Sequence, residues 1–204
     1  MTRLTLSPLE PEFIQNPYPA YAAARAKGPV LFWEEYGMLA AFDAATVTAL
    51  LRDRRLGRER PTPAAHPPHL AQWARVERNS MLELEPPRHT RLRGLVLRAF
   101  TSRRIGNLQP DIEQITAKLL ADLPDDGPFD LIPHFCTQVP VRLIARLLGV
   151  PEDIWPDLLR WSNAMVAMYM AGRTRAVEDA AEAATAEFCT YLHDYINLRR
   201  TARR

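Results

Sequence analysis

Apolar residues recur at helical spacing along most of the chain. In residues 103–123, one side of the expected helix carries Leu108, Ile112, Ile115 and Leu119. Residues 174–200 predict a longer helix, whose apolar stripe consists of Val177, Ala181, Ala184, Phe188, Leu192 and Tyr195. Prolines and glycines mark the ends of further helices expected at residues 16–28, 44–53, 86–100, 133–149 and 151–170. Pro140 is a candidate kink inside the fourth of these.

Two short segments have the composition of strands. Residues 29–35 and 37–43 are apolar and rich in strand formers, which predicts a β-hairpin turning near Tyr36 and Gly37. Asp43 can then cap the helix that follows. We further expect an extended piece at residues 127–132, and a long loop at residues 56–85 with a short helix near 69–76. The pattern predicts a mainly α fold with a small β-sheet and argues against a doubly wound sheet.

The helix expected at residues 86–100 carries cations on its apolar face. His89 and Arg93 lie one turn apart, on the side that also holds Leu92, Val96, Leu97 and Phe100. Arg91 and Arg98 fall on the opposite side, as solvated charges do. A buried Arg93 would need an anion nearby, because arginine does not lose its proton. That anion is either an internal Asp or Glu or a bound carboxylate or phosphate, and spacing leaves both open.

Bulk composition narrows the class of protein. The chain has 204 residues, 26 Lys+Arg and 24 Asp+Glu, and the two signs are interleaved, which disfavours a nucleic-acid binder. Cys136 and Cys189 show no metal-ligand spacing, so we expect no metal site and two buried structural thiols. No signal peptide or membrane-spanning run is recognisable, and the cytoplasm is the expected location.

The segment "SMLELEPPRHTRLRGLVLRAFTSRRI", residues 80–105, resembles the C-helix region of bacterial cytochromes P-450 of the soluble class. That family shows a Pro-Pro pair, an H-x-x-x-R motif, and a phenylalanine followed by Thr and Arg-Arg. The matching residues here are Pro86, Pro87, His89, Arg93, Phe100, Thr101, Arg103 and Arg104. Residues 16–35 and 129–154 are similar to other parts of the family's first half. The resemblance is collinear over all 204 residues.

The resemblance implies a haem-thiolate monooxygenase that inserts one oxygen atom of O2 into a small apolar substrate. It implies that His89 and Arg93 bind haem propionates, and that residues 1–204 are the N-terminal part of a single domain, through about the G helix. The cysteine that ligates the iron lies near the family's C-terminus, and neither cysteine here has its sequence setting. We therefore expect this chain alone to be inactive and to contain no catalytic residue.

Two segments imitate family motifs that the chain lacks. "AGRT", residues 171–174, is one residue too short for the oxygen-activating motif and reads as a turn between helices. "EPPR", Glu85 to Arg88, has E-x-x-R spacing, but its two prolines exclude the helix that the family's pair requires.

The resemblance also suggests ligands and partners. Trp73, Met81 and Met168 are candidate substrate contacts, although a role in packing would explain them equally well. Arg91, Arg98, Arg103 and Arg104 would face a ferredoxin-type electron donor in a complete enzyme, or simply be solvated. The alternatives to a monooxygenase half are a non-catalytic helical module with an anion-binding pocket and one half of a split enzyme. If the chain is half of a monooxygenase or of a split enzyme, apolar residues such as Leu143, Ile144, Leu147 and Leu148 would lack packing partners.

Overall fold

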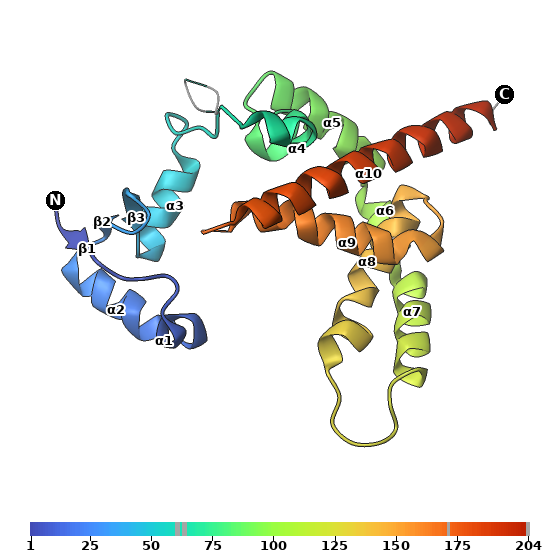
Figure 1. The fold of residues 1–204 in the computed structure, drawn as a ribbon, viewed down its shortest axis with the longest axis horizontal. Coiled ribbons are helices and arrows are strands. Elements are labelled where there is room, and N and C mark those ends of the chain that lie inside the picture. Colours follow the sequence, from blue (N-terminus) through green and yellow to red (C-terminus); the bar gives the residue numbers. More distant parts are fainter. Residues whose placement is uncertain (60–61, 63–64, 171, 203–204) are drawn as a thin grey trace. The chain divides into compact units, whose positions relative to one another are not determined.

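The computed structural model describes residues 1–59, 62, 65–170 and 172–202. The chain divides into two compact units, Met1–Gly57 (unit 1) and Arg58–Arg204 (unit 2). Both are mainly helical apart from one small sheet in unit 1 (Figure 1).

Unit 1 is built around a three-stranded sheet. Its elements are β1 (Arg3–Leu4), α1 (Pro11–Gln15), α2 (Tyr18–Lys27), β2 (Val30–Trp33), β3 (Met38–Ala41) and α3 (Ala44–Arg52). The strand order is β1-β2-β3, in which β2 and β3 form the expected antiparallel hairpin and β1 adds in parallel to β2. The sequence analysis missed β1 because two residues are too few for an alternating pattern.

Local chemistry fixes the helix boundaries of unit 1 as expected. Gly28, with φ of 149°, ends α2, and the Asp43 carboxylate caps α3 by accepting from the backbone N–H of Thr46 at 2.9 Å. The core consists of Leu4, Ala24 and Leu31, with Trp33 and Phe42 packed against it. Trp33 Nε1 donates to the Leu6 carbonyl at 2.7 Å, so the indole also holds the segment after β1 in place by a hydrogen bond.

Unit 2 contains the longer helices. They are α4 (Ala71–Glu77), α5 (Arg88–Ala99), α6 (Ser102–Gly106), α7 (Gln109–Ala121), α8 (Gln138–Leu148), α9 (Trp155–Val166) and α10 (Arg175–Thr201). Single turns precede or follow them at η1 (Pro68–Leu70), η2 (Met81–Glu83), η3 (Ile132–Cys136), η4 (Glu152–Ile154) and η5 (Ala167–Tyr169). The short helix expected inside the long loop is confirmed as α4.

Three local predictions for unit 2 need correction. The single helix expected over residues 103–123 is broken at Asn107 into α6 and α7, because Thr101 caps a separate first turn. The extended piece expected at residues 127–132 ends before Leu131, which is helical and leads into η3. The irregularity expected at Pro140 lies just before it, in the π-turn η3, and α8 then runs without interruption to Gly149. Ala171, in the turn expected at 171–173, is outside the described residues.

The core of unit 2 lies along α10, which packs against α9 and α4 (Figure 1). One buried cluster contains Leu70, Trp73, Ala74, Met168 and Ala181. The second contains Ala145, Val150, Leu158, Trp161 and Ala184. The predicted α10 stripe is confirmed, since Ala181 and Ala184 are buried and the stripe's other members are half-buried.

Three glutamates on α10 (Glu178, Glu182 and Glu187) extend the packing with polar contacts, and we call them the α10 acid ladder. Glu182 accepts backbone N–H groups of Gln72 and Trp73, each at 2.9 Å at its closest. Both N–H groups belong to the first turn of α4, where helical partners are lacking and no local side chain caps the helix. Glu182 is thus an N-cap supplied from 110 residues away.

The two outer members of the ladder hold neighbouring segments. Glu178 accepts from His69 Nε2 at 2.8 Å and from Arg173 Nε at 3.2 Å. These two contacts, His69 first, hold the pKa of the Glu178 carboxyl below its usual range. Glu187 accepts from Trp161 Nε1 at 2.8 Å and from Arg160 at 2.7 Å, which joins α9 to α10.

The described residues contain neither a cluster of metal-ligating side chains nor a helix suited to cross a membrane. No group of three or more His, Cys, Asp or Glu side chains is arranged to hold a metal ion. Among the helices that the structure describes, none combines the length and the apolar character needed to cross a bilayer.

We predict that Glu182→Ala destabilises unit 2 by about 1–2 kcal/mol, because two N–H groups of α4 lose their acceptor. The measurement is urea denaturation followed by circular dichroism. Asp179→Asn is the control, since among the described residues Asp179 makes only an exposed pair with Arg175, and the change should cost under about 0.5 kcal/mol. Equal stability of the two variants would contradict the capping role.

We also predict that Glu178→Gln lowers stability at pH 7 but not in acid. A carboxyl whose pKa is lowered by folding stabilises the protein above its unfolded pKa, near 4.5. That stabilisation disappears as the pH falls through the lower folded pKa. Denaturation curves of wild type and variant at pH 7, 5 and 3 should therefore converge with acidification. A difference that stays constant with pH would refute the assignment.

Candidate functional site

The face of α5 that carries His89 and Arg93 is open. The side chain of His89 is half-buried and that of Arg93 is exposed. The expectation of an inward-facing Arg93 is therefore wrong for this chain. The physical reason is that no element among the described residues covers the second half of this face, so α5 has no buried residue and Leu97 on the same face is 57% exposed.

His89 and Arg93 keep the one-turn spacing on α5 that the sequence indicated. Both side chains leave the first half of α5, and in the described parts of the chain neither lies within 4 Å of a carboxylate. An internal Asp or Glu is therefore not the partner here. A carboxylate or phosphate could reach both groups without displacing a protein anion, and Arg93 could bind it in bidentate fashion.

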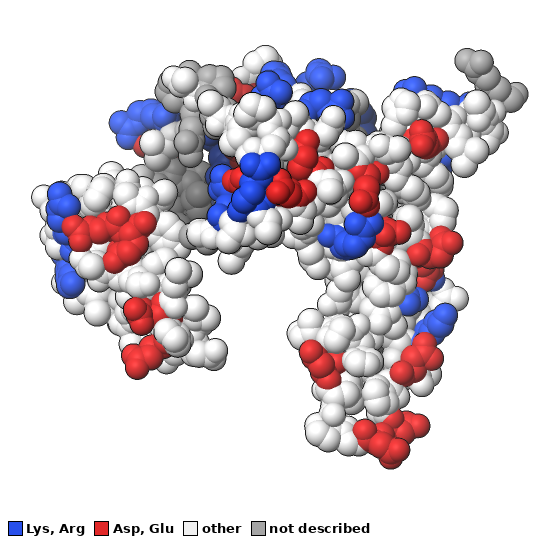
Figure 2. All heavy atoms as spheres, in the orientation of Figure 1, with Lys and Arg blue, Asp and Glu red and all other residues white. Residues whose placement is uncertain are grey.

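Basic residues also occupy the other sides of this region. Arg91, Arg98, Arg103 and Arg104 are all exposed, as expected. Figure 2 shows basic side chains gathered over the part of unit 2 that contains α4 and α5. Elsewhere on the visible face, acidic and basic side chains are mixed.

The two segments that imitate family motifs have structural roles at the starts of helices. Pro87 precedes the first residue of α5, so Glu85 and Arg88 do not share a helix, and the Glu85 carboxylate instead accepts the backbone N–H of Arg58. Thr174 caps α10 by accepting from the N–H of Val177. Cys189 is half-buried, whereas Cys136 is exposed, which corrects the expectation of two buried thiols. Cys136 is exposed because η3 packs loosely, with Ile132 60% exposed.

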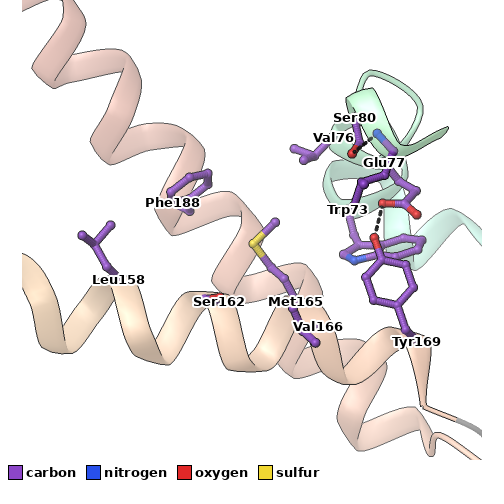
Figure 3. A pocket seen from close by; sticks show the side chains of 11 residues that line it. Trp73, Val76, Glu77, Ser80, Leu158, Ser162, Met165, Val166, Tyr169 and Phe188 are labelled. Atoms are coloured by element: carbon purple, nitrogen blue, oxygen red, sulfur yellow. Dashed lines mark hydrogen bonds between the residues drawn. The ribbon is translucent and has the colours of Figure 1, made fainter. Parts of the chain in front are cut away.

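A pocket of about 290 Å³ lies between α4, η2, α9 and α10 (Figure 3). Its aliphatic and aromatic lining includes Trp73, Leu82, Leu158, Met165, Val166 and Phe188. Ser80 and Ser162 add hydroxyl groups, and Glu77 is the one charged residue among those that line it. A cavity of this size and composition suits a small, largely apolar molecule.

The three candidate substrate contacts are placed differently. Trp73 is 7% exposed, belongs to the core and still lines the pocket. Met168, 3% exposed, packs in the same core cluster and lines an adjoining cavity of about 560 Å³ that shares Trp73, Glu77 and Tyr169. Met81 is half-buried and is not among the residues lining either cavity. Trp73 and Met168 thus both pack in the core and each lines a cavity, whereas Met81 lines neither.

Glu77 and Tyr169 form a polar pair in the pocket wall that the sequence analysis missed. Tyr169 Oη donates to Glu77 Oε2 at 2.7 Å (Figure 3). Burial, followed by the hydrogen bond and charge of Glu77, raises the pKa of Tyr169 to about 12. The two residues are 92 positions apart. No local pattern could therefore have paired them.

Known proteins with similar sequences are bacterial cytochromes P-450. The vitamin D(3) 25-hydroxylase of Pseudonocardia autotrophica is 38% identical over 192 residues, which cover 93% of this chain and 45% of the relative. The cytochrome P-450 monooxygenase PikC of Streptomyces venezuelae is 34% identical, over 97% of this chain and 46% of its own. No protein-family model matches the sequence.

Solved structures agree with the sequence relatives. A cytochrome P-450 named BioI, in complex with an acyl carrier protein bearing hexadec-9Z-enoic acid, matches with a TM-score of 0.86 and 25% identity. The match covers 95% of this chain and 51% of that one. The chain therefore spans about half the length of the relatives it matches, and its fold is a partial cytochrome P-450 fold. On sequence and on structure alike, the chain belongs to the cytochrome P-450 family and represents about half of such a protein.

Proposed function

We propose that these 204 residues are the N-terminal part of a single haem-thiolate monooxygenase domain. The complete protein would insert one oxygen atom of O2 into a small apolar organic substrate. The observation that carries the proposal is the 38% identity to a hydroxylase across 93% of the chain. The relatives are named hydroxylases and monooxygenases, which supports the reaction class but not a particular substrate.

The arrangement on α5 supports haem as the cofactor. His89 and Arg93 would bind the propionate carboxylates, with His89 near the positive end of the helix dipole and Arg93 one turn later. The exposed apolar residues of the same face, including Val96 and Leu97, would pack beside the porphyrin ring. The bound haem would supply the oxygen chemistry, and the residues of this chain would hold and orient it.

The iron ligand would come from a part of the protein outside these residues. Cys136 is exposed on a loosely packed turn and Cys189 lies within α10, and neither shares a helix with His89 and Arg93. We accordingly propose that the chain alone is inactive, and that a second half of the domain is its main partner.

Exposed apolar surface favours such a partner. On α8, Ile144 is 50% and Leu148 is 47% exposed, and on α5 Leu97 is 57% exposed. Folded proteins are stabilised by only about 5–15 kcal/mol, so uncovered core faces on several helices matter. A covering half fits these faces better than a free-standing anion-binding module does. For electron supply, the exposed arginines Arg91, Arg98, Arg103 and Arg104 would suit an acidic ferredoxin-type donor.

We predict that the 204-residue chain mixed with haem, reduced and exposed to carbon monoxide gives no thiolate-type Soret band. The reason is that no cysteine of the chain is placed to ligate iron beside α5. The absorption spectrum is the measurement. The same experiment with the chain extended by the segment that completes the domain should give the band. A thiolate-type band from the short chain would refute the proposed division of roles.

We predict further that Arg93→Gln in the complete protein speeds haem loss roughly tenfold, because one charge-assisted contact to a propionate is removed. Transfer of haem to excess apomyoglobin measures this loss without reference to activity. Arg91→Gln is the matched control, since Arg91 leaves the opposite side of α5 and should keep the wild-type rate. Equal rates for the two variants would remove the propionate role of Arg93.

A further inference from the structure

The pocket between α4, η2, α9 and α10 is largely apolar. Its polar side-chain groups include the hydroxyls of Ser80, Ser162 and Tyr169 and one carboxylate, which lies beside aromatic rings. The Trp73 and Tyr169 rings are 6.3 Å apart between centroids and inclined at 61°, so they form a corner (Figure 3). The phenol of that corner donates to Glu77. Two aromatic faces and a carboxylate are the groups that recognise organic ammonium ions.

One oxygen of the Glu77 carboxylate is available to a ligand. Oε2 accepts the phenol hydrogen at 2.7 Å, whereas Oε1 has no hydrogen-bond donor in the part of the chain that the structure describes. Glu77 is half-buried, so an approaching donor would meet a carboxylate that is only partly hydrated. Because Tyr169 supplies a hydrogen bond but no positive charge, the charge of Glu77 is not neutralised by its partner.

Glu77 is the one charged residue among those that line the smaller pocket. Arg58 interacts electrostatically with Glu77 and Tyr169, and its guanidinium is bound by Glu83, at 2.9 Å from Nε and 2.6 Å from Nη2. Arg78, Arg88 and Arg173, together with Arg58, line the larger adjoining cavity, whose wall Glu77 also forms.

We infer that this pocket takes an apolar molecule bearing one protonated amine, with the ammonium group at Glu77 and the aliphatic part against Leu158, Met165 and Phe188. The inference deepens the proposed function, since it names the class of substrate for the same site. Glu77 then determines specificity, by favouring amines over alcohols and disfavouring acids of the same chain length. Its carboxylate makes no contribution to the oxygen chemistry.

The test compares n-octylamine, n-octanol and n-octanoate as ligands of the 204-residue chain without haem, by isothermal titration calorimetry at pH 7. We expect the amine to bind roughly tenfold more tightly than the alcohol, and the acid to bind most weakly. Glu77→Gln should lower amine affinity to the level of the alcohol and leave alcohol affinity unchanged. Tyr169→Phe keeps the carboxylate and should keep the preference for the amine.

Glu113→Gln is the charge-matched control, because Glu113 is an exposed residue of α7 whose side chain bonds only Gln109 among the described residues. It should behave as wild type. The inference is overturned by equal affinities, by tightest binding of octanoate, by absence of binding, or by an amine preference that survives Glu77→Gln. The monooxygenase proposal is tested separately by haem spectra, so either can fail without the other.

Discussion

The arrangement of unit 2 depends on the carboxylate of Glu182 at the start of α4. A seven-residue helix has few internal hydrogen bonds, and α4 has no capping side chain of its own. The carboxylate supplies the missing acceptors and at the same time fixes α4 against α10. Trp73 is thereby held in the core while its ring forms part of the pocket wall. The pocket therefore depends on a polar contact made outside it.

The acid ladder also explains how a largely polar long helix organises its neighbours. Small residues, Ala181 and Ala184, allow close approach of α4 and α9, and the glutamates beside them bind donors that the approach brings near. Glu187 satisfies the indole N–H of the buried Trp161, which would otherwise lose its hydrogen bond on burial. Apolar packing and hydrogen bonding thus act at neighbouring positions of α10.

The sequence predicted elements whose signals are local and missed contacts that are not. The hairpin, the Asp43 cap and the α10 stripe follow from turn residues, a capping side chain and helical periodicity, and each is confirmed. The candidate site is harder to predict from the sequence, because Glu77 and Tyr169 are 92 residues apart and Glu182 caps a helix 110 residues away. Helical periodicity also cannot say whether an apolar face is covered, and this is why Arg93 was expected inside and lies exposed.

The exposure of the α5 face changes the physical argument for a haem site without removing it. A buried arginine would have required an anion, whereas an exposed one does not, so the pair alone no longer demands a ligand. What remains distinctive is the combination on one face of two donors one turn apart and a row of exposed apolar side chains, Val96, Leu97 and Phe100. Solvated cations are ordinary on helix surfaces, but they rarely need an apolar strip beside them. A ligand that is flat, apolar and acid-bearing at one edge would cover the strip and neutralise the cations together, and haem has that chemistry.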